Sequence, residues 1–561
     1  MYTKSKLRSI FGCESRLYAD YLREQLRGFR EANVKCYFIF RGGSETRDKL
    51  LETDENEGMS SGKNRVYEPL FARDVYKEVL NDMDMDYAIC EYANKRDCVA
   101  LGQRLHCPVL AFDIEYFFFG TEYVPYPSLQ FNPTTKVMQC KLLLLDMLME
   151  KFQLCERDIA VYITLFDDNV FSEEFREKLL RKLRLPLSYG RRHETFLRWL
   201  SRNGGSALEI ISKLVSRNED RTIRLELERK IKNLKVRESG GLPTKYFLDR
   251  DCCVINRGDR EWFSKGLIWR FVAIPYVNVY RHGIVTGSWS TEDNDAEDAM
   301  LLSAPIVRYA LDLLTNYNDA ELLFVGAKRN PNVDDENPPA RAKDLLKIAT
   351  TIRKPEYGSS NVFENGWSGV SKYRLFEHFL AESVQMNTSV LEQVPAECRM
   401  LVVALVYFAR QKGSDVDNEA YSVLLSYAVL TVADGGAGVD EPLKDGQCEH
   451  ARALMDEYSN ISDEEVELIL DRKSLHPLVE FQHCLRHLNF LNTLCGSTLA
   501  PTVYSKTYSA TFVYKILRDM KRYYNGNGRR FLEDKLDRAS SVLSIVNKLY
   551  NLYSDMKLKK V

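Results

Sequence analysis

Residues 90–119 read CEYANKRDCVALGQRLHCPVLAFDIEYFFF and decide the fold of the first part of the chain. The run Pro108–Phe112 is apolar without alternation, which is typical of a strand covered by helices on both faces of a parallel sheet. Asp113 and Glu115 follow at its carboxyl end, where open α/β sheets bind ligands. Carboxylates gathered there suit Mg²⁺ or Mn²⁺. The alternative is that Asp113 caps the next turn and Glu115 is solvated.

Helices and strands alternate on the amino-terminal side of this stretch. Amphipathic patterns predict helices over 18–32, 66–83 and 95–105, and strands over 34–40 and 87–90. Short links in a β-α-β-α-β order indicate a parallel sheet with right-handed crossovers. The predicted fold class is therefore α/β at the amino-terminal side, followed by a mostly α-helical region. The later patterns predict helices over 135–152, 171–185 and 220–234, and strand-like segments over 269–279 and 283–289.

Composition limits the class of protein. A chain of 561 residues is too long to fold around a single hydrophobic core. The predicted domains are 1–170, 171–240 and 241–561. The net charge of -2 provides no overall field for nucleic acid or membrane, so such binding needs a local patch. The 13 cysteines form no CxxC pair, which favours reduced thiols in an intracellular protein. No apolar run reaches the length of a membrane span.

Three further groups of residues stand out, and the first two could carry chemistry. Asp167-Asp168-Asn169 follows the apolar run Ile159–Phe166 and offers more oxygen ligands at the end of an element. His483, Cys484 and His487 share one predicted helix, where a zinc site is the functional reading and helix packing the default. Trp262, Trp269 and Trp289 are predicted to be core residues.

Basic residues gather on the predicted helix 220–234. Arg224, Lys230 and Lys232 lie on it and could follow a phosphate backbone. Glu219, Glu226 and Glu228 balance them, so an ordinary solvated helix is the alternative.

Four motifs in this order resemble the asteroid family, which belongs to the flap-endonuclease-like (XPG-like) branch of the PIN-type nucleases. They are FIFRGG at Phe38–Gly43, KLLET at Lys49–Thr53, CPVLAFD at Cys107–Asp113 and LFDDN at Leu165–Asn169. The resemblance covers the first third of the chain and continues weakly through Trp289 and residues 303–309. It implies a PIN-like domain that hydrolyses phosphodiesters with two Mg²⁺ or Mn²⁺ ions held by carboxylates.

The resemblance also assigns roles to individual residues. The metal ligands it implies are Asp97, Asp113, Glu115 and Asp168, of which Asp113 and Glu115 are the catalytic pair. Arg41 stands where the family has the carboxylate of a Phe-Asp-Gly turn, and it would either repel a dication or bind a phosphate. In flap-endonuclease relatives a helical element near this place grips the DNA backbone. The implied nucleic-acid contacts are therefore Arg41, Arg224, Lys230 and Lys232.

The sequence also departs from the family pattern. Family members begin with a Gly-rich segment and a strand bearing an aspartate, and this sequence opens at the helix that follows. We therefore expect a shortened member with an exposed sheet edge, or a start further upstream. The resemblance implies a structure-specific DNA endonuclease of the DNA repair class, nuclear, with a degraded acidic site and impaired catalysis. The alternative is a non-catalytic scaffold for branched or overhanging DNA or for repair or signalling proteins, with no membrane and no small-molecule cofactor.

Overall fold

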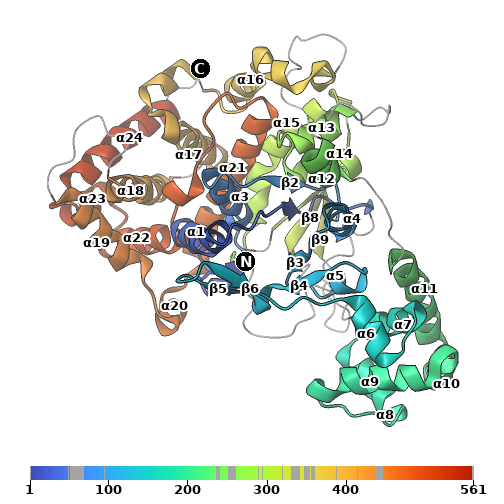
Figure 1. The fold of residues 1–561 in the computed structure, drawn as a ribbon. Helices are drawn as coiled ribbons and strands as arrows, with labels where there is room; N and C mark the ends of the chain where they lie inside the picture. The colour runs from blue at the N-terminus through green and yellow to red at the C-terminus, as the bar shows by residue number, and fades with distance from the viewer. Residues whose placement is uncertain are drawn as a thin grey trace.

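The protein is described by a computed structural model (Figure 1). The residues that the structure describes are 2–47, 50, 68–93, 95–167, 170–234, 241–249, 261–288, 290–293, 295–318, 320–329, 341–346, 354, 361–386, 388–413, 415–435 and 446–558.

The first part of the chain alternates helices and short strands, as the sequence predicts. In chain order these are α1 (Ser15–Glu31), β1 (Phe38–Phe40), α3 (Ala72–Asp82), β2 (Tyr87–Ile89), α4 (Lys95–Leu105), β3 (Val109–Ala111), α5 (Glu115–Phe118) and β4 (Tyr123–Pro125). The mixed α/β class is therefore confirmed for this part. The predicted helix 95–105 coincides with α4.

The strands of this first part form separate pairs and not one continuous sheet among the described residues. Within the described residues, β1 pairs in parallel with β2, and β3 pairs in parallel with β4. The prediction that the strand 108–112 is buried on both faces is wrong, since Leu110 is 36% and Phe112 42% exposed. The reason is that β3 has β4 as its one paired neighbour among the described strands.

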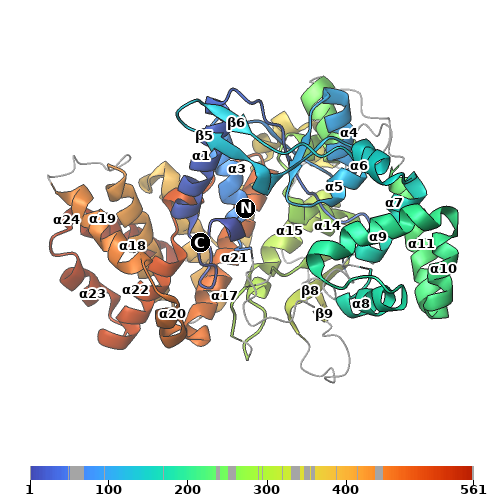
Figure 2. The ribbon, with the colours of Figure 1, turned by 60° about the horizontal axis from the view of Figure 1, so that its bottom comes forward.

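A hairpin and a helical lobe follow. The hairpin is β5 (Gln130–Asn132) with β6 (Val137–Gln139), and the lobe consists of α6 (Leu145–Phe152), α7 (Glu156–Phe166), α8 (Glu173–Lys182), α9 (Tyr189–Asn203), α10 (Ala207–Leu214) and α11 (Arg217–Leu234). Both views show the lobe projecting from the rest of the molecule (Figure 1, Figure 2). The helix predicted over 135–152 is wrong in its first half. The Asn132 side chain accepts hydrogen bonds from the backbone of Thr134 and Thr135 and makes a hairpin turn there.

The remaining chain is mostly helical, with one small sheet. In chain order the elements are α12 (Leu242–Thr244), a π-helical turn (Lys245–Asp249), α13 (Glu261–Ile268), α14 (Ile274–His282), β7 (Ile284–Thr286), α15 (Ala304–Leu314), β8 (Leu322–Arg329), β9 (Arg341–Leu346), α16 (Leu375–Glu382), α17 (Arg399–Lys412), α18 (Asp417–Ala433), α19 (Gln447–Ser459), α20 (Asp463–Ile469), α21 (Arg472–Leu494), α22 (Ala510–Tyr523), α23 (Gly528–Lys535) and α24 (Ser540–Leu558). Strand β8 pairs in parallel with β7 and antiparallel with β9.

The strand predicted over 269–279 is wrong, because α14 occupies most of this range. Proline at the start of a helix supplies a suitable φ angle and needs no hydrogen-bond donor, and Pro275 has this position. Gly283 ends the helix in the left-handed conformation at φ 63°.

Two large groups of buried side chains hold the molecule together. One extends from Tyr2 in the first turn to Met556 in α24 and includes apolar residues of α1, α3 and α17 to α22. The other lies between Val99 and Leu227 and fills the lobe and its junction with α4 and α5. Among the described helices we find none that combines the length and the apolar character needed to cross a bilayer. The domain boundaries at 170 and 240 stay a prediction.

Glu14 connects the beginning of the chain to the carboxyl-terminal helices through hydrogen bonds. Its buried carboxylate accepts hydrogen bonds from the Ser509 hydroxyl at 2.9 Å and from the Thr511 backbone N–H at 2.8 Å. The Thr511 hydroxyl donates a further hydrogen bond to it. Burial raises the pKa of Glu14, and these three donors act in the opposite direction. The segment before α1 and the start of α22 are therefore joined through one side chain.

Replacing Glu14 by alanine is expected to lower the free energy of unfolding by roughly 2 to 4 kcal/mol, because three donors in a dry site lose their acceptor. Urea denaturation followed by circular dichroism measures this change. Glu24→Ala on the exposed face of α1 is the matched control and should change stability by about 0.5 kcal/mol or less. Equal stability of Glu14→Ala and the control would show that the two parts of the chain are held together elsewhere.

Candidate functional site

A cleft of about 870 Å³ opens at the carboxyl ends of β1, β2 and β3, next to α11. The backbone after β1 is tied to the backbone after β2, since Gly42 N–H donates to Tyr92 O at 2.8 Å and Gly43 N–H to Glu91 O at 2.9 Å. A side chain at position 42 would not fit, because its Cβ would lie 1.9 Å from Cys90 O. The close approach explains the glycine turn that the sequence places there.

The structure brings the predicted catalytic pair together in this cleft. Asp113 Oδ1 accepts a hydrogen bond at 2.9 Å from the backbone N–H of Glu115, the first residue of the short helix α5. Lys95, at the start of α4, reaches both carboxylates: its Nζ lies 2.6 Å from Asp113 Oδ2 and also contacts Glu115. Asp113 and Glu115 therefore share one cation, the ammonium group of Lys95.

A second lysine enters the same cluster from the lobe. Lys230 of α11 is buried, and its Nζ lies 2.9 Å from Glu115 Oε1 and 2.5 Å from Asp167 Oδ2. Asp167 follows the last residue of α7. Charge-assisted hydrogen bonds of this length in a buried site are strong. Lys230 thus connects α11, α7 and α5 through two carboxylates.

Two more acidic residues of the cleft, Glu91 and Asp97, contact groups other than the two lysines. Glu91 forms an ion pair with Arg281 of α14. Asp97 lies in the first turn of α4, and burial is the main reason that its pKa is raised. The backbone at Gly241 packs directly against this carboxylate, since a Cβ there would lie 2.0 Å from Asp97 Oδ1. A carboxyl group held in this way favours its neutral form.

The residues present do not fit the two-cation centre that the resemblance implies. Such a centre needs several charged carboxylates with free lone pairs. Here Lys95 and Lys230 occupy oxygens of Asp113, Glu115 and Asp167 and offset two of their three negative charges, and Arg281 pairs with Glu91. Within the described ranges, no group of three histidine, cysteine, aspartate or glutamate side chains is arranged to hold a metal ion. Asp168, the fourth predicted ligand, lies outside the described residues.

The predicted nucleic-acid contacts are distributed over different places. Arg41 is exposed at the rim of the cleft. Arg224 is exposed on α11 and hydrogen-bonds Asp220 at 3.0 Å and Ser212 at 2.9 Å. Lys230 is the buried ion-pair partner described above, and the Lys232 side chain lies outside the described part of α11.

Sequence reasoning did not single out Lys95 and gave Asp167 a smaller role than its neighbour Asp168. Lys95 could have been found from its place at the first turn of a helix whose amino end faces the Asp113–Glu115 pair. The role of Lys230 depends on how α11 folds back onto α7, and local sequence gives no signal for that packing.

The two histidines of α21 are packing residues in a dry environment. His483 and His487 are buried, and neither ring nitrogen of His483 has a hydrogen-bond partner in the described structure. Burial lowers the pKa of His483 to about 3 and also lowers the pKa of His487. The default interpretation of helix packing is therefore the one that this geometry supports.

These histidines predict a loss of stability in acid. An unfolded histidine binds a proton near pH 6.5, whereas folded His483 stays neutral, so the unfolded chain takes up more protons as the pH falls below 6.5. Between pH 7 and pH 5.5 we expect the wild type to lose about 1 kcal/mol more stability than His483→Leu. Urea titrations at both pH values measure the difference, with exposed His450→Leu as control. A wild type and a His483→Leu variant with parallel pH profiles would contradict this assignment.

The geometry defines a mixed α/β protein with a helical carboxyl-terminal part and a cleft at its strand ends, in which carboxylates pair with lysines. Comparison with known proteins narrows this class. The family profile of the Asteroid N-terminal domain matches residues 397–560, which include α17 to α24. These matched residues lie outside the segments whose motifs carry the resemblance in the sequence.

Individual relatives extend the similarity to nearly the whole chain. Single-strand DNA endonuclease ASTE1 of Homo sapiens is 22% identical over 567 residues, which is 92% of this chain and 80% of that protein. The protein of the same name from Pongo abelii matches with the same identity and coverage. Protein asteroid of Drosophila melanogaster is 24% identical over 143 residues, 24% of this chain and 16% of that protein. The chain is thus similar to proteins of the asteroid family, by this profile over residues 397–560 and by these relatives at 22 to 24% identity.

Proposed function

We propose that this chain binds single-stranded or overhanging DNA and that its cleft has impaired metal-dependent hydrolysis. The observation that carries the proposal is the placement of Lys95 and Lys230 on Asp113, Glu115 and Asp167. Nucleases of the implied class use a dication at carboxylates of this kind to polarise the phosphate. An ammonium group neutralises the same oxygens but offers no open coordination position for a water molecule.

Support for DNA binding comes from the cleft rim and from the relatives. Arg41, Arg96 and Arg229 are exposed around the cleft, and guanidinium groups pair readily with phosphate oxygens. The relatives of Homo sapiens and Pongo abelii carry the name of a single-strand DNA endonuclease. The relation to a PIN-like sheet, with Mg²⁺ or Mn²⁺ in the ancestral site, is part of the proposal. It is supported by the two parallel strand pairs with carboxylates at their ends.

Labelled single-stranded, overhanging and flap DNAs test both halves of the proposal in the same samples. The purified chain is mixed with each DNA in the presence of Mn²⁺, and retention on a native gel and strand length on a denaturing gel are recorded. We expect retained DNA of unchanged length. Cleavage that disappears in Asp113→Ala and Glu115→Ala would overturn impaired hydrolysis, and absence of retention would overturn DNA binding.

A further inference from the structure

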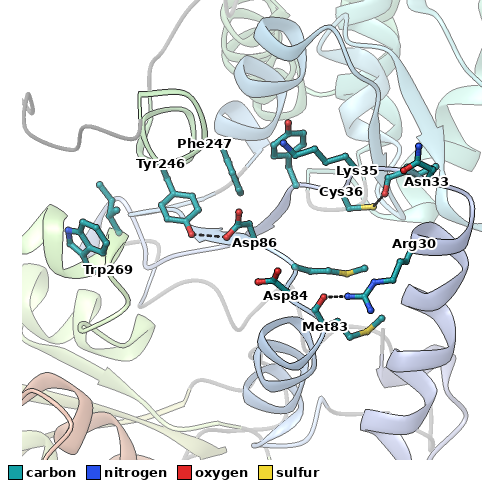
Figure 3. Close-up of a pocket in the computed structure, with 14 residues that line it drawn as sticks. Arg30, Asn33, Lys35, Cys36, Met83, Asp84, Asp86, Tyr246, Phe247 and Trp269 are labelled. Carbon is teal, nitrogen blue, oxygen red and sulfur yellow. Dashed lines mark hydrogen bonds between the residues drawn. The ribbon is translucent and has the colours of Figure 1, made fainter.

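Trp269 is an exposed aromatic residue between two hollows. It follows α13, and 57% of its surface is accessible, which corrects its prediction as a core residue. One hollow of about 580 Å³ lies between Trp269, the π-helical turn and the amino ends of β1 and β2 (Figure 3). The other, of about 890 Å³, lies between Trp269, α13 and residues 363–368. Because the acidic cleft opens at the carboxyl ends of β1 and β2, these hollows are separate from it.

The larger hollow is lined by stacked aromatic rings. Phe271 and Trp367 lie parallel with ring centres 5.2 Å apart, and Phe363 stacks on Trp367 at 4.7 Å. Trp262 in turn stacks on Phe363 at 5.4 Å, and its carbonyl accepts a hydrogen bond from Trp367 Nε1 at 2.7 Å. These contacts fix the wall of the hollow, so a ligand would find a preformed surface.

Charge at the larger hollow favours a cation. Its lining contains the carboxylates of Glu261 and Glu364 and one ammonium group, that of Lys265. Lys265 pairs with Glu261 at 2.6 Å, whereas Glu364 is exposed at the rim. The faces of aromatic rings attract positive charge, and a neighbouring carboxylate adds to that attraction. A polyanion such as DNA would meet a carboxylate there instead.

The smaller hollow shares Trp269 with the larger one but has a different charge. Tyr246 stands between Trp269 and Asp86, and its hydroxyl donates to Asp86 Oδ1 at 3.2 Å (Figure 3). Asp84 adds a second carboxylate, while Lys35 lies over the Tyr37 ring at 5.0 Å. Arg30 and Lys35 balance the two carboxylates there, and Arg270 donates to the Tyr246 hydroxyl at 3.0 Å, so the attraction for a cation is confined to the larger hollow.

We propose that the larger Trp269 hollow binds an arginine side chain of a partner protein. The guanidinium plane stacks on the exposed indole, and its N–H groups donate to Glu364. Arginine suits this site better than lysine, because its flat, weakly hydrated head can stack and donate at the same time.

A fluorescein-labelled arginine-rich peptide tests the proposal by fluorescence anisotropy with the full chain. We expect Trp269→Ala and Glu364→Gln each to raise the peptide dissociation constant by about tenfold. The same peptide with citrulline in place of arginine, which keeps the shape and removes the charge, should bind no better to the wild type than to Trp269→Ala.

Matched controls keep the test specific to the hollow. Tyr523→Ala removes an equally exposed ring from α22, and Glu382→Gln removes an exposed carboxylate at the end of α16, so both should bind like the wild type. Thermal melting confirms that the substituted proteins are folded. Equal binding of the citrulline peptide, or tighter binding of a trimethyl-lysine peptide, would overturn the proposal. Substitutions at Asp113 and Glu115 should not change peptide binding, which separates this test from that of the proposed function.

Discussion

Replacing Lys230 by methionine is expected to lower the free energy of unfolding by about 3 to 5 kcal/mol, more than any exposed substitution in the lobe. The buried Nζ lies between Glu115 and Asp167, and methionine has a similar length but no charge. Two carboxylates would then face each other in a largely dry site, and the junction of α11 with α5 and α7 would lose its ionic link. Urea denaturation followed by circular dichroism measures this loss.

Two comparisons make the Lys230 result specific. Lys178→Met, on the exposed face of α8 in the same lobe, should change stability by about 0.5 kcal/mol or less. Mn²⁺ should restore part of the stability of Lys230→Met, because a dication can take the position of the lost ammonium group, and should leave the wild type unchanged. A Lys230→Met protein as stable as Lys178→Met would show that the buried cluster is not held by this lysine.

Removing the three exposed guanidinium groups of the cleft rim is expected to weaken DNA binding by about 10- to 100-fold. Arg41, Arg96 and Arg229 surround the opening, and each phosphate contact on a single strand contributes a salt-dependence slope of roughly -0.7. The triple alanine variant should therefore reduce the steepness of log Kd against log salt by about 2. Fluorescence anisotropy with a labelled oligonucleotide at several salt concentrations gives both quantities.

A matched triple variant controls for the loss of positive charge. Arg181, Arg198 and Arg529 are exposed, lie away from the cleft and each pair with a glutamate on the same helix, as Arg229 does. Their replacement by alanine should change the affinity less and leave the slope nearly unaltered. If both triple variants weaken binding to the same extent, DNA is attracted by overall charge and not by the cleft.

Local sequence patterns predicted the alternating elements up to β3 because each has a clear period and short polar links. Helix α4 and strand β2 are examples, with bounds within one residue of those predicted. The predictions were wrong where a turn or a helix start interrupts a segment whose apolar residues suggest another element. Asn132 makes the β5–β6 turn and Pro275 begins α14, so the sequence did contain the turn residue and the helix-start residue. The predictions gave more weight to the apolar residues around them.

The site was predictable only in part. The strand-end position of Asp113 and Glu115 follows from the apolar run before them, and the structure places them in a cleft. What pairs with them could not be read locally, since Lys230 is 115 residues from Glu115 in the chain. The same applies to Trp269, whose apolar ring indicated burial although the chain around it leaves the indole exposed.

Titration of Mn²⁺ followed by electron paramagnetic resonance tests most directly whether lysines have taken the place of metal in the cleft. The free ion gives a sharp signal that decreases on binding, so occupancy is measured without DNA and without catalysis. We predict no Mn²⁺ binding at the cleft of the wild type and detectable binding when Lys95 and Lys230 are both replaced by methionine. Binding to the wild type that is lost in Asp113→Ala and Glu115→Ala would contradict the account and indicate a working metal centre.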